Sequence, residues 1–355
     1  MKKYSPYSEW KIFYHTDHIN KLLKGERPGP IYIRMKPTNI CNQRCYYCAY
    51  ADDSLFDGRK VDSRQSIPWE IMEKTLYEMK EMGVKAVTFS GGGEPLCYPS
   101  VMDMLRTVDT LGMDYSMITN GQALRGEAAD YLKKAKWIRV SFDAAKRETY
   151  EGIRGVNTFD QILNNIENFA RIKEATCTLG INCVVTHNNA NEIFDICRLV
   201  KELGADNIKL SPILVKSQEE AYHREIKDLV MNQIEEAKKK LENEQFRIID
   251  KYSNDIALND SCEKEYSQCY IQNFFAVIAA DSKVYRCHQC AYTQKGEIGD
   301  LSENSFKEIW YAQETIDKIN HFNPQQECGF RCAFDERNRL LNDFIHMDKN
   351  HVNFI

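Results

Sequence analysis

The chain has 355 residues, of which 47 are Lys or Arg and 52 are Asp or Glu, so its formal net charge at pH 7 is −5. Hydrophobic residues make up 43% and charged residues 28%, which excludes a disordered chain and indicates a globular protein of about two domains. No block of basic residues is present to neutralise several phosphates, so we expect no nucleic-acid partner.

The N-terminal residues lack the continuous apolar core of a signal peptide, and the longest apolar run, at residues 274–280, is too short to cross a membrane. We therefore expect a cytoplasmic protein with no membrane contact. In a reducing compartment its 13 cysteines stay as thiols, so clustered cysteines indicate metal binding or catalysis in preference to disulfides.

Short apolar or β-branched runs alternate with longer amphipathic stretches between residues 31 and 213. The runs predict strands at 31–36, 85–89, 115–118, 137–142, 178–186 and 207–211. The stretches predict helices at 68–82, 99–111, 124–135, 159–172 and 191–203. Parallel strands need helix-sized crossovers, so the pattern predicts an α/β fold, a partial (β/α)6 TIM-like barrel with its chemistry at the C-terminal strand ends.

The flanking segments have a different character. Residues 1–30 are expected to be an N-terminal extension before the barrel core at 31–215. The charged stretch at 218–246 suits a mostly exposed helix, so residues 216–250 are predicted to be a helical linker. Six cysteines follow between Cys262 and Cys332, which predicts a small metal-organised domain at 251–345 and a tail at 346–355.

Cys41, Cys45 and Cys48 form a C-x3-C-x2-C triad directly after the first predicted strand. Three thiolates can hold three irons of a [4Fe–4S] cluster and leave the fourth iron open to a small molecule. The alternative is a zinc knuckle, but such a site needs a fourth Cys or His, and the next twenty residues contain neither.

A glycine-rich segment, residues 90–95 with the sequence SGGGEP, follows the second predicted strand. Residues without side chains allow the backbone to approach a ligand closely, and the carboxylate of Glu94 can accept an α-amino group. The segment lies one β-α unit after the triad, so both should face the same cavity.

Together these residues resemble the radical S-adenosylmethionine (radical SAM) superfamily. Tyr47 stands at the aromatic position of the family's cysteine motif that contacts adenine, and Gly92, Gly93 and Glu94 match its methionine-binding segment. The resemblance implies that S-adenosylmethionine (SAM) chelates the open iron. It also implies that the reduced cluster cleaves the sulfonium, and that the resulting 5′-deoxyadenosyl radical takes hydrogen from the substrate. An external electron donor such as flavodoxin or ferredoxin is implied as a partner.

Two later strand ends fit the same family. Asn120 ends the third predicted strand, and Ser141 lies in the fourth. The resemblance implies that Asn120, Ser141 and Arg154 bind the nucleoside or the methionine carboxylate, and the guanidinium of Arg154 suits a carboxylate. The alternatives are a turn role for Asn120 and a surface charge for Arg154.

Four C-terminal cysteines can close a second [4Fe–4S] cluster, and they are Cys269, Cys287, Cys328 and Cys332. Their arrangement around a predicted hairpin resembles the SPASM/twitch extension of some radical SAM enzymes. The sequence departs from that pattern at Ser282, where glycine is usual, and in its C-x3-C late pair, which is commonly C-x2-C.

Two cysteines of this region are left over, Cys262 and Cys290. Cys290 is an alternative ligand, because it forms a C-x-x-C pair with Cys287. A domain with two auxiliary clusters would need at least one more cysteine, so we expect a single auxiliary [4Fe–4S] cluster. Zinc is the alternative metal, since four thiolates also suit it.

An auxiliary cluster beside the cavity can accept the second electron of an oxidation. We therefore expect a dehydrogenase acting on the alcohol of a sugar, an aminocyclitol or a nucleotide sugar, similar to the 2-deoxy-scyllo-inosamine dehydrogenase type. The alternative is a maturase of a ribosomally made peptide, although about thirty residues before the first strand are too few for a peptide-recognition domain. A non-catalytic iron–sulfur or zinc protein is a third reading, and it leaves the glycine segment without a role. No residue is singled out as a general base.

Overall fold

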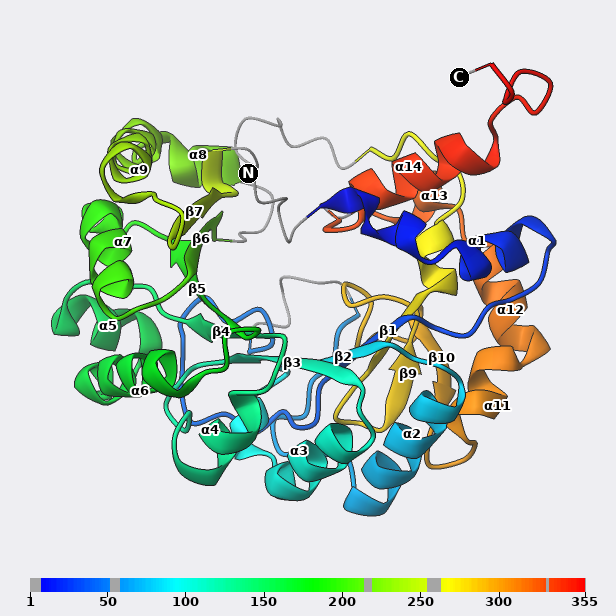
Figure 1. Cartoon of the computed structure of the whole chain (residues 1–355), viewed down its shortest axis with the longest axis horizontal. Coiled ribbons are helices and arrows are strands. Elements are labelled where there is room, and N and C mark those ends of the chain that lie inside the picture. Colours follow the sequence, from blue (N-terminus) through cyan, green and yellow to red (C-terminus); the bar gives the residue numbers. More distant parts are fainter. Residues whose placement is uncertain (1–7, 52–57, 214–218, 254–262, 330–331, 355) are drawn as a thin grey trace.

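The computed structural model describes residues 8–51, 58–213, 219–253, 263–329 and 332–354. Its strands form one ten-stranded sheet in the order β10-β9-β8-β1-β2-β3-β4-β5-β6-β7 (Figure 1). The parallel barrel strands are β1 (Tyr32–Met35), β2 (Ala86–Phe89), β3 (Asp114–Thr119), β4 (Trp137–Ser141), β5 (Thr178–Val185), β6 (Asn207–Pro212) and β7 (Arg247–Asp250). Beside β1 lie β8 (Phe275–Ile278), β9 (Lys283–Tyr285) and β10 (Glu297–Asp300).

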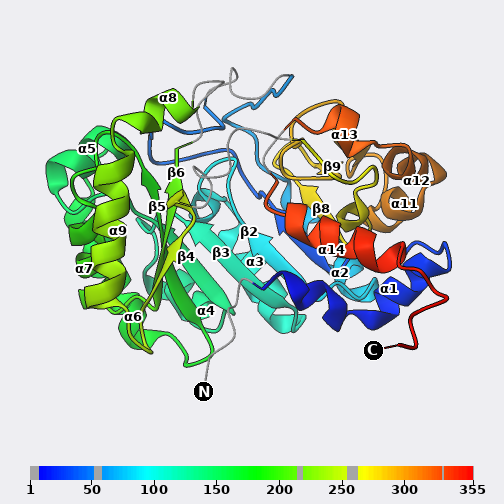
Figure 2. The same cartoon turned by 90° about the horizontal axis from the view of Figure 1, so that it is seen from above.

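Helices cover the outer face of the curved sheet and leave its inner face open (Figures 1 and 2). The barrel helices are α2 (Trp69–Glu81), α3 (Val101–Thr110), α4 (Gly126–Leu132), α5 (Arg147–Arg154), α6 (Phe159–Ile172), α7 (Ile193–Glu202), α8 (Glu219–Arg224) and α9 (Lys227–Leu241). The remaining helices are α1 (Thr16–Leu23), α11 (Phe306–Tyr311), α12 (Gln313–Asn320), α13 (Pro324–Glu327) and α14 (Asp335–Ile345). Short 3₁₀ helices are η1 (Glu9–Tyr14), η2 (Pro95–Cys97) and η3 (Tyr270–Asn273).

The barrel strands alternate apolar residues with polar or cationic ones. In β1, Ile33 and Met35 are fully buried, whereas Arg34 lines the inner cavity. The pattern repeats with Arg139 in β4 and Lys209 in β6, which also line the cavity. Successive residues of a strand point to opposite faces of the sheet, so the apolar set packs under the helices and the polar set faces inward.

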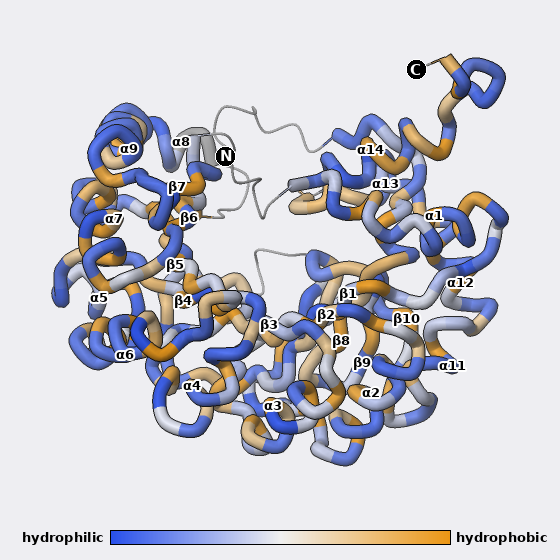
Figure 3. Tube along the Cα trace, viewed as in Figure 1, coloured by the Kyte–Doolittle hydropathy of each residue, from blue (hydrophilic) through white to orange (hydrophobic). Residues whose placement is uncertain are grey.

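The predicted elements are largely confirmed. The six predicted strands overlap β1 to β6, and the five predicted helices overlap α2, α3, α4, α6 and α7, whereas α5 was not predicted. The expectation of an exposed helical linker at 216–250 is wrong: α9 packs on α7, and β7 pairs in parallel with β6. Most of α9 is hydrophilic (Figure 3). Its residues Val230, Ile234 and Ala237 are nevertheless buried and form an apolar stripe at helical spacing.

The cysteine-rich part continues the barrel sheet. Strand β8 pairs in parallel with β1, with Tyr32 opposite Phe275 and Met35 opposite Ile278. The indole nitrogen of Trp310 in α11 donates to the carbonyl of Pro28 at 2.9 Å, and η1 of the N-terminal segment packs on α14. The N-terminal segment and the cysteine-rich part are therefore built onto the same edge of the barrel. Within the described ranges, no helix is both long enough and apolar enough to cross a membrane.

Candidate functional site

The cysteine triad lies on the loop that follows β1, and the end of α5 holds this loop in place. The backbone N–H groups of Arg44 and Tyr46 donate to the carbonyls of Arg154 at 3.0 Å and Ile153 at 3.2 Å. The last carbonyls of a helix have no partner within the helix, so they are available to fix such a loop. Helix α5, which the sequence did not reveal, therefore positions the triad.

The triad thiols share one electrostatic environment. Burial, together with the neighbouring Glu94, Cys45 and Cys48, raises the pKa of Cys41 to about 11. Burial also raises the pKa of Cys45, against the opposing effect of Arg154. A bound metal favours the thiolate form and would offset this mutual repulsion, so the donor set fits an iron–sulfur cluster.

The glycine segment packs backbone against backbone on the residues that precede the triad. The N–H of Glu94 donates to the carbonyl of Ile40 at 2.9 Å. A Cβ atom on Gly93 would stand 2.2 Å from that carbonyl oxygen, and one on Gly92 would stand 1.8 Å from Oδ1 of Asn39. An added side chain would collide with Asn39 or Ile40 at either position, so packing within the protein requires both glycines, and their approach to a ligand stays a prediction.

The carboxylate of Glu94 is buried and anchored to the end of β3. It accepts hydrogen bonds from Oγ1 of Thr119 at 2.6 Å, from the N–H of Asn120 at 2.7 Å and from the N–H of Leu96 at 3.1 Å. Burial raises the pKa of Glu94, and these donors oppose the rise. The side chain of Asn120 in turn donates to Oδ1 of Asn42 at 2.6 Å. Asn120 thus belongs to the site, and its binding of the nucleoside stays a prediction.

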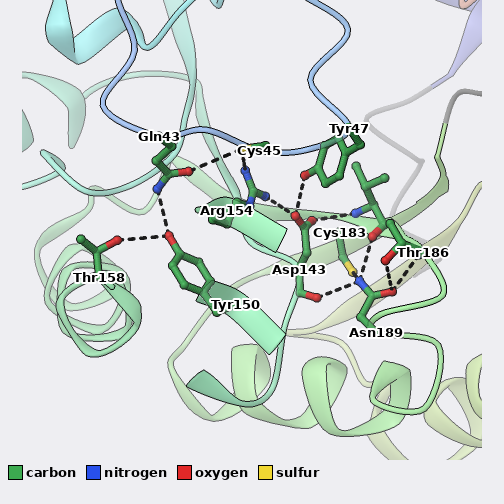
Figure 4. A network of polar contacts seen from close by, with 11 residues as sticks. Gln43, Cys45, Tyr47, Asp143, Tyr150, Arg154, Thr158, Cys183, Thr186 and Asn189 are labelled. Carbon is green, nitrogen blue, oxygen red and sulfur yellow. Dashed lines mark hydrogen bonds and ion pairs between the residues drawn. The ribbon is translucent and has the colours of Figure 1, made fainter. Parts of the chain in front are cut away.

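A buried polar network links the triad to β4 and β5 (Figure 4). Asp143 forms an ion pair with Arg154 at 2.5 Å and accepts a hydrogen bond from the hydroxyl of Tyr47 at 2.5 Å. Arg154 also donates to Sγ of Cys45 at 3.5 Å. The other oxygen of Asp143 accepts from the N–H of Val184 at 2.8 Å. Burial raises the pKa of Tyr47 well above its usual value, so its hydroxyl remains a donor.

Arg154 has partners in this network that the sequence did not indicate. Arg154 is only 4% exposed, so its interpretation as a surface charge is wrong. Its Nε is buried without a hydrogen-bond partner in the structure, which leaves one donor for a ligand. Asp143 was missed, although its place just after β4 was a signal. Ser141, the last residue of β4, lines the cavity, and its contact with SAM stays a prediction.

The four predicted auxiliary ligands lie in one group. Cys332 interacts electrostatically with Cys269 and Cys328, and these neighbours together with burial raise its pKa to about 12. Cys287 interacts with the same Cys332 thiol. A bound metal would remove this mutual repulsion, and the role of the four thiols as ligands of one cluster stays a prediction.

Cys290 joins this group next to Cys287. A hydrogen bond with the thiol of Cys287 lowers the pKa of Cys290. A stabilised thiolate is the form that binds metal, so Cys290 is a fifth candidate ligand. Cys262 lies outside the described residues. In the part of the chain that the structure describes, no three His, Cys, Asp or Glu side chains have the spacing of ligands to a single metal ion.

The three triad cysteines and Cys332 of the auxiliary group line a common cavity of about 2640 Å³. The triad, the glycine segment and the inner face of the barrel line one side of it. His288, Gln289, Cys332 and Phe334 from the cysteine-rich part line the other. The cavity therefore has room for a substrate between the triad and the SPASM part.

Two family models match the chain. Residues 35–200 match the radical SAM superfamily, and residues 269–333 match the iron–sulfur cluster-binding domain called SPASM. The chain belongs to the radical SAM superfamily. Its cofactors are the radical SAM [4Fe–4S] cluster, SAM and an auxiliary iron–sulfur cluster in the SPASM domain. The two kinds of cluster predicted for this radical SAM protein are thus confirmed, and the individual cysteines that hold each of them stay predictions.

Curated relatives match about half of the chain. A probable GTP 3′,8-cyclase of Saccharolobus islandicus is 30% identical over 181 residues, which are 50% of this chain and 55% of that protein. The chain thus spans about half the length of the curated relatives it matches.

Solved structures share the fold over most of the chain. Streptococcus suis SuiB bound to precursor peptide SuiA has a TM-score of 0.62 and 17% identity, and the match covers 87% of this chain and 71% of SuiB. The enzyme anSMEcpe with AdoMet and the Kp18Cys peptide has a TM-score of 0.61 and 17% identity, with coverages of 89% and 96%. These likenesses establish the barrel with its SPASM region.

Proposed function

We propose that this radical SAM enzyme dehydrogenates an alcohol of a polar, anionic small molecule such as a sugar phosphate or a nucleotide sugar. The observation that carries the proposal is the charge of the inner barrel wall, where Arg34, Arg139 and Lys209 line the cavity. Guanidinium and ammonium groups are the side chains that bind phosphate and carboxylate. Among the described residues of the barrel strands, Asp114 is the single carboxylate in the cavity lining, and it forms an ion pair with Lys136 at 3.4 Å.

The rest of this wall suits hydroxyl groups. Oγ1 of Thr88 and Oγ of Ser116 share a hydrogen bond of 2.7 Å across adjacent strands. Nε of Arg34, Oδ1 of Asn207 and Oγ of Ser211 are buried without hydrogen-bond partners in the structure. Buried polar atoms normally have partners, so these atoms are suited to a polar ligand in the barrel. An aminocyclitol, which carries positive charge, fits the cationic wall less well than an anionic sugar does.

When bound, the cofactors supply a radical that removes a hydrogen atom from the substrate and a cluster that can accept its second electron. Overall, one secondary alcohol and one SAM would give one ketone, 5′-deoxyadenosine, methionine and a proton. In this proposal Gly92, Gly93 and Glu94 hold the methionine end of SAM, Tyr47 and Ser141 face its nucleoside, and the cationic wall orients the substrate.

The proposal is tested with anaerobically reconstituted protein, SAM and dithionite. The probes are UDP-glucose, glucose 6-phosphate and glucose, each deuterated at its carbinol carbons. We expect deuterium in 5′-deoxyadenosine and a matching ketone from a phosphorylated probe, and neither from glucose. Arg139→Gln should raise KM at least tenfold, whereas Arg106→Gln on the exposed face of α3 should not. Deuterium transfer from glucose alone, or equal KM values for the two variants, would contradict the proposal.

A peptide substrate is the second candidate, and the size of the cavity favours it. The volume of about 2640 Å³ exceeds the range of about 300–1,000 Å³ that is usual for small-molecule sites, although SAM itself fills part of it. A peptide with acidic side chains would also complement the cationic wall. In the same assay, deuterium transfer from a short aspartate-rich peptide and from none of the sugars would favour this candidate. An external flavodoxin or ferredoxin as electron donor stays a prediction in both cases.

A further inference from the structure

Tyr292, two residues after Cys290, has a constrained backbone conformation. Its φ angle is +64°, in the left-handed region that residues with side chains rarely adopt. The side chain is 4% exposed, and its hydroxyl donates to Oδ1 of Asn39 at 2.5 Å. Its carbonyl accepts from the N–H of Lys60 at 3.1 Å. Such a conformation persists only where surrounding contacts hold it, which marks Tyr292 as a fixed contact between the SPASM domain and the barrel.

Asn39 lies between Tyr292 and the methionine-binding segment and contacts both. Its Nδ2 donates to the carbonyl of Asp62 at 2.9 Å, so both ends of the amide are held. Its Oδ1 stands 1.8 Å from the position that a Cβ on Gly92 would take, and the hydroxyl oxygen of Tyr292 stands 2.8 Å from it. Asn39 and Tyr292 therefore form the surface on which Gly92 rests.

Arg59 makes a second link between the two cysteine motifs. It is 4% exposed, and its guanidinium donates to the carbonyl of Gln289, between Cys287 and Cys290, at 2.9 Å. The same guanidinium donates to the carbonyl of Ala49, next to Cys48, at 3.3 Å. The auxiliary loop, residues 287–292, is thus bonded to both the triad loop and the SAM-binding surface.

We propose that Tyr292 is a positioning residue through which the auxiliary loop controls the affinity of the enzyme for SAM. A cluster held by the auxiliary cysteines keeps the loop, and with it the Tyr292 hydroxyl, against Asn39, so that Gly92 presents its backbone to SAM. Because coupling between two binding sites is reciprocal, bound SAM also stabilises the auxiliary site. The proposal depends on the family's cofactors and holds whether the substrate is a sugar or a peptide.

The test is Tyr292→Phe, which removes the hydroxyl and keeps the ring. Loss of one buried hydrogen bond should raise the dissociation constant of SAM about three- to tenfold, measured by equilibrium dialysis on the reconstituted protein. The matched control is Tyr285→Phe, since Tyr285 is also buried in the SPASM domain but donates its hydroxyl to Asp281 at 2.5 Å. Iron content and the EPR signals of both reduced clusters should match the wild type in both variants.

Two further measurements separate this role from a general loss of structure. In a double-mutant cycle with Asn39→Leu, the effects of the two substitutions on SAM affinity should be strongly non-additive. In a Cys287→Ser/Cys290→Ser background, SAM affinity should already be reduced, and Tyr292→Phe should reduce it no further. Two results would overturn the proposal. One is a wild-type dissociation constant of SAM in iron-replete Tyr292→Phe. The other is a full effect of Tyr292→Phe on SAM affinity in the Cys287→Ser/Cys290→Ser background.

Discussion

Gly93→Ala probes the close packing of the methionine-binding segment. A Cβ atom at this position would stand 2.2 Å from the carbonyl oxygen of Ile40 and 2.4 Å from the carbonyl carbon of Asn39, whereas ordinary contact begins at 3.4 Å. Both obstacles are backbone, and the Ile40 carbonyl also accepts the N–H of Glu94, so neither can rotate away. The two segments must separate by about 1 Å, and a displacement of that size at a reacting centre costs about 100-fold in rate.

We therefore expect Gly93→Ala to weaken SAM binding by about 10- to 100-fold and to destabilise the fold by about 1–3 kcal/mol through overpacking. Equilibrium dialysis of SAM and formation of 5′-deoxyadenosine measure the first effect, and thermal unfolding measures the second. The matched control is Gly152→Ala in α5, where an added Cβ meets no atom within 4 Å and should be neutral or stabilising by up to about 1 kcal/mol. Wild-type SAM affinity in Gly93→Ala would refute the packing explanation.

Three other outcomes are expected. Arg154→Met leaves the buried Asp143 carboxylate without its cation and should cost about 3–5 kcal/mol in denaturant unfolding, and Arg154→Met/Asp143→Asn should recover part of this loss. Burial and the nearby Arg34, Lys36 and Arg59 hold the pKa of His288 well below 6.5. As the pH falls through 6.5, the unfolded chain therefore binds a proton at His288 and the folded chain does not, so the free energy of unfolding decreases. His288→Gln should make this decrease smaller, as measured by thermal unfolding at several pH values. Alanine at all three triad positions should lower the iron content and abolish 5′-deoxyadenosine formation.

Local sequence patterns were sufficient for strands β1 to β6. The apolar runs of β1 to β6 are short and bounded by amphipathic helices, so periodicity alone located them. The helix predicted at 218–246 is present as α9, but its many charged residues led to the wrong expectation of exposure, and β7 was not predicted. The pairing of β8 with β1 joins residues more than 200 positions apart, and no local pattern reports such a pairing.

The candidate site shows the same limit. Cysteine spacing and the glycine run revealed the triad and the methionine-binding segment, because that chemistry needs neighbouring residues. The contacts of Asp143 with Tyr47 and Arg154, and of Tyr292 with Asn39, depend on the meeting of distant segments. The sequence around Tyr292 does not indicate its role, because that role depends on its backbone conformation and on its hydrogen bond to Asn39.

The parallel pairing of β1 with β8 has a consequence for biosynthesis. A ribosome releases residues 32–35 long before residues 275–278, so one edge of the growing barrel sheet has no partner during most of translation. The triad loop follows that unpaired strand, and the surface beneath Gly92 needs Tyr292 from the same late segment. The site is incomplete until the last third of the chain has left the ribosome. We therefore expect the cluster to be inserted after synthesis of the chain is complete.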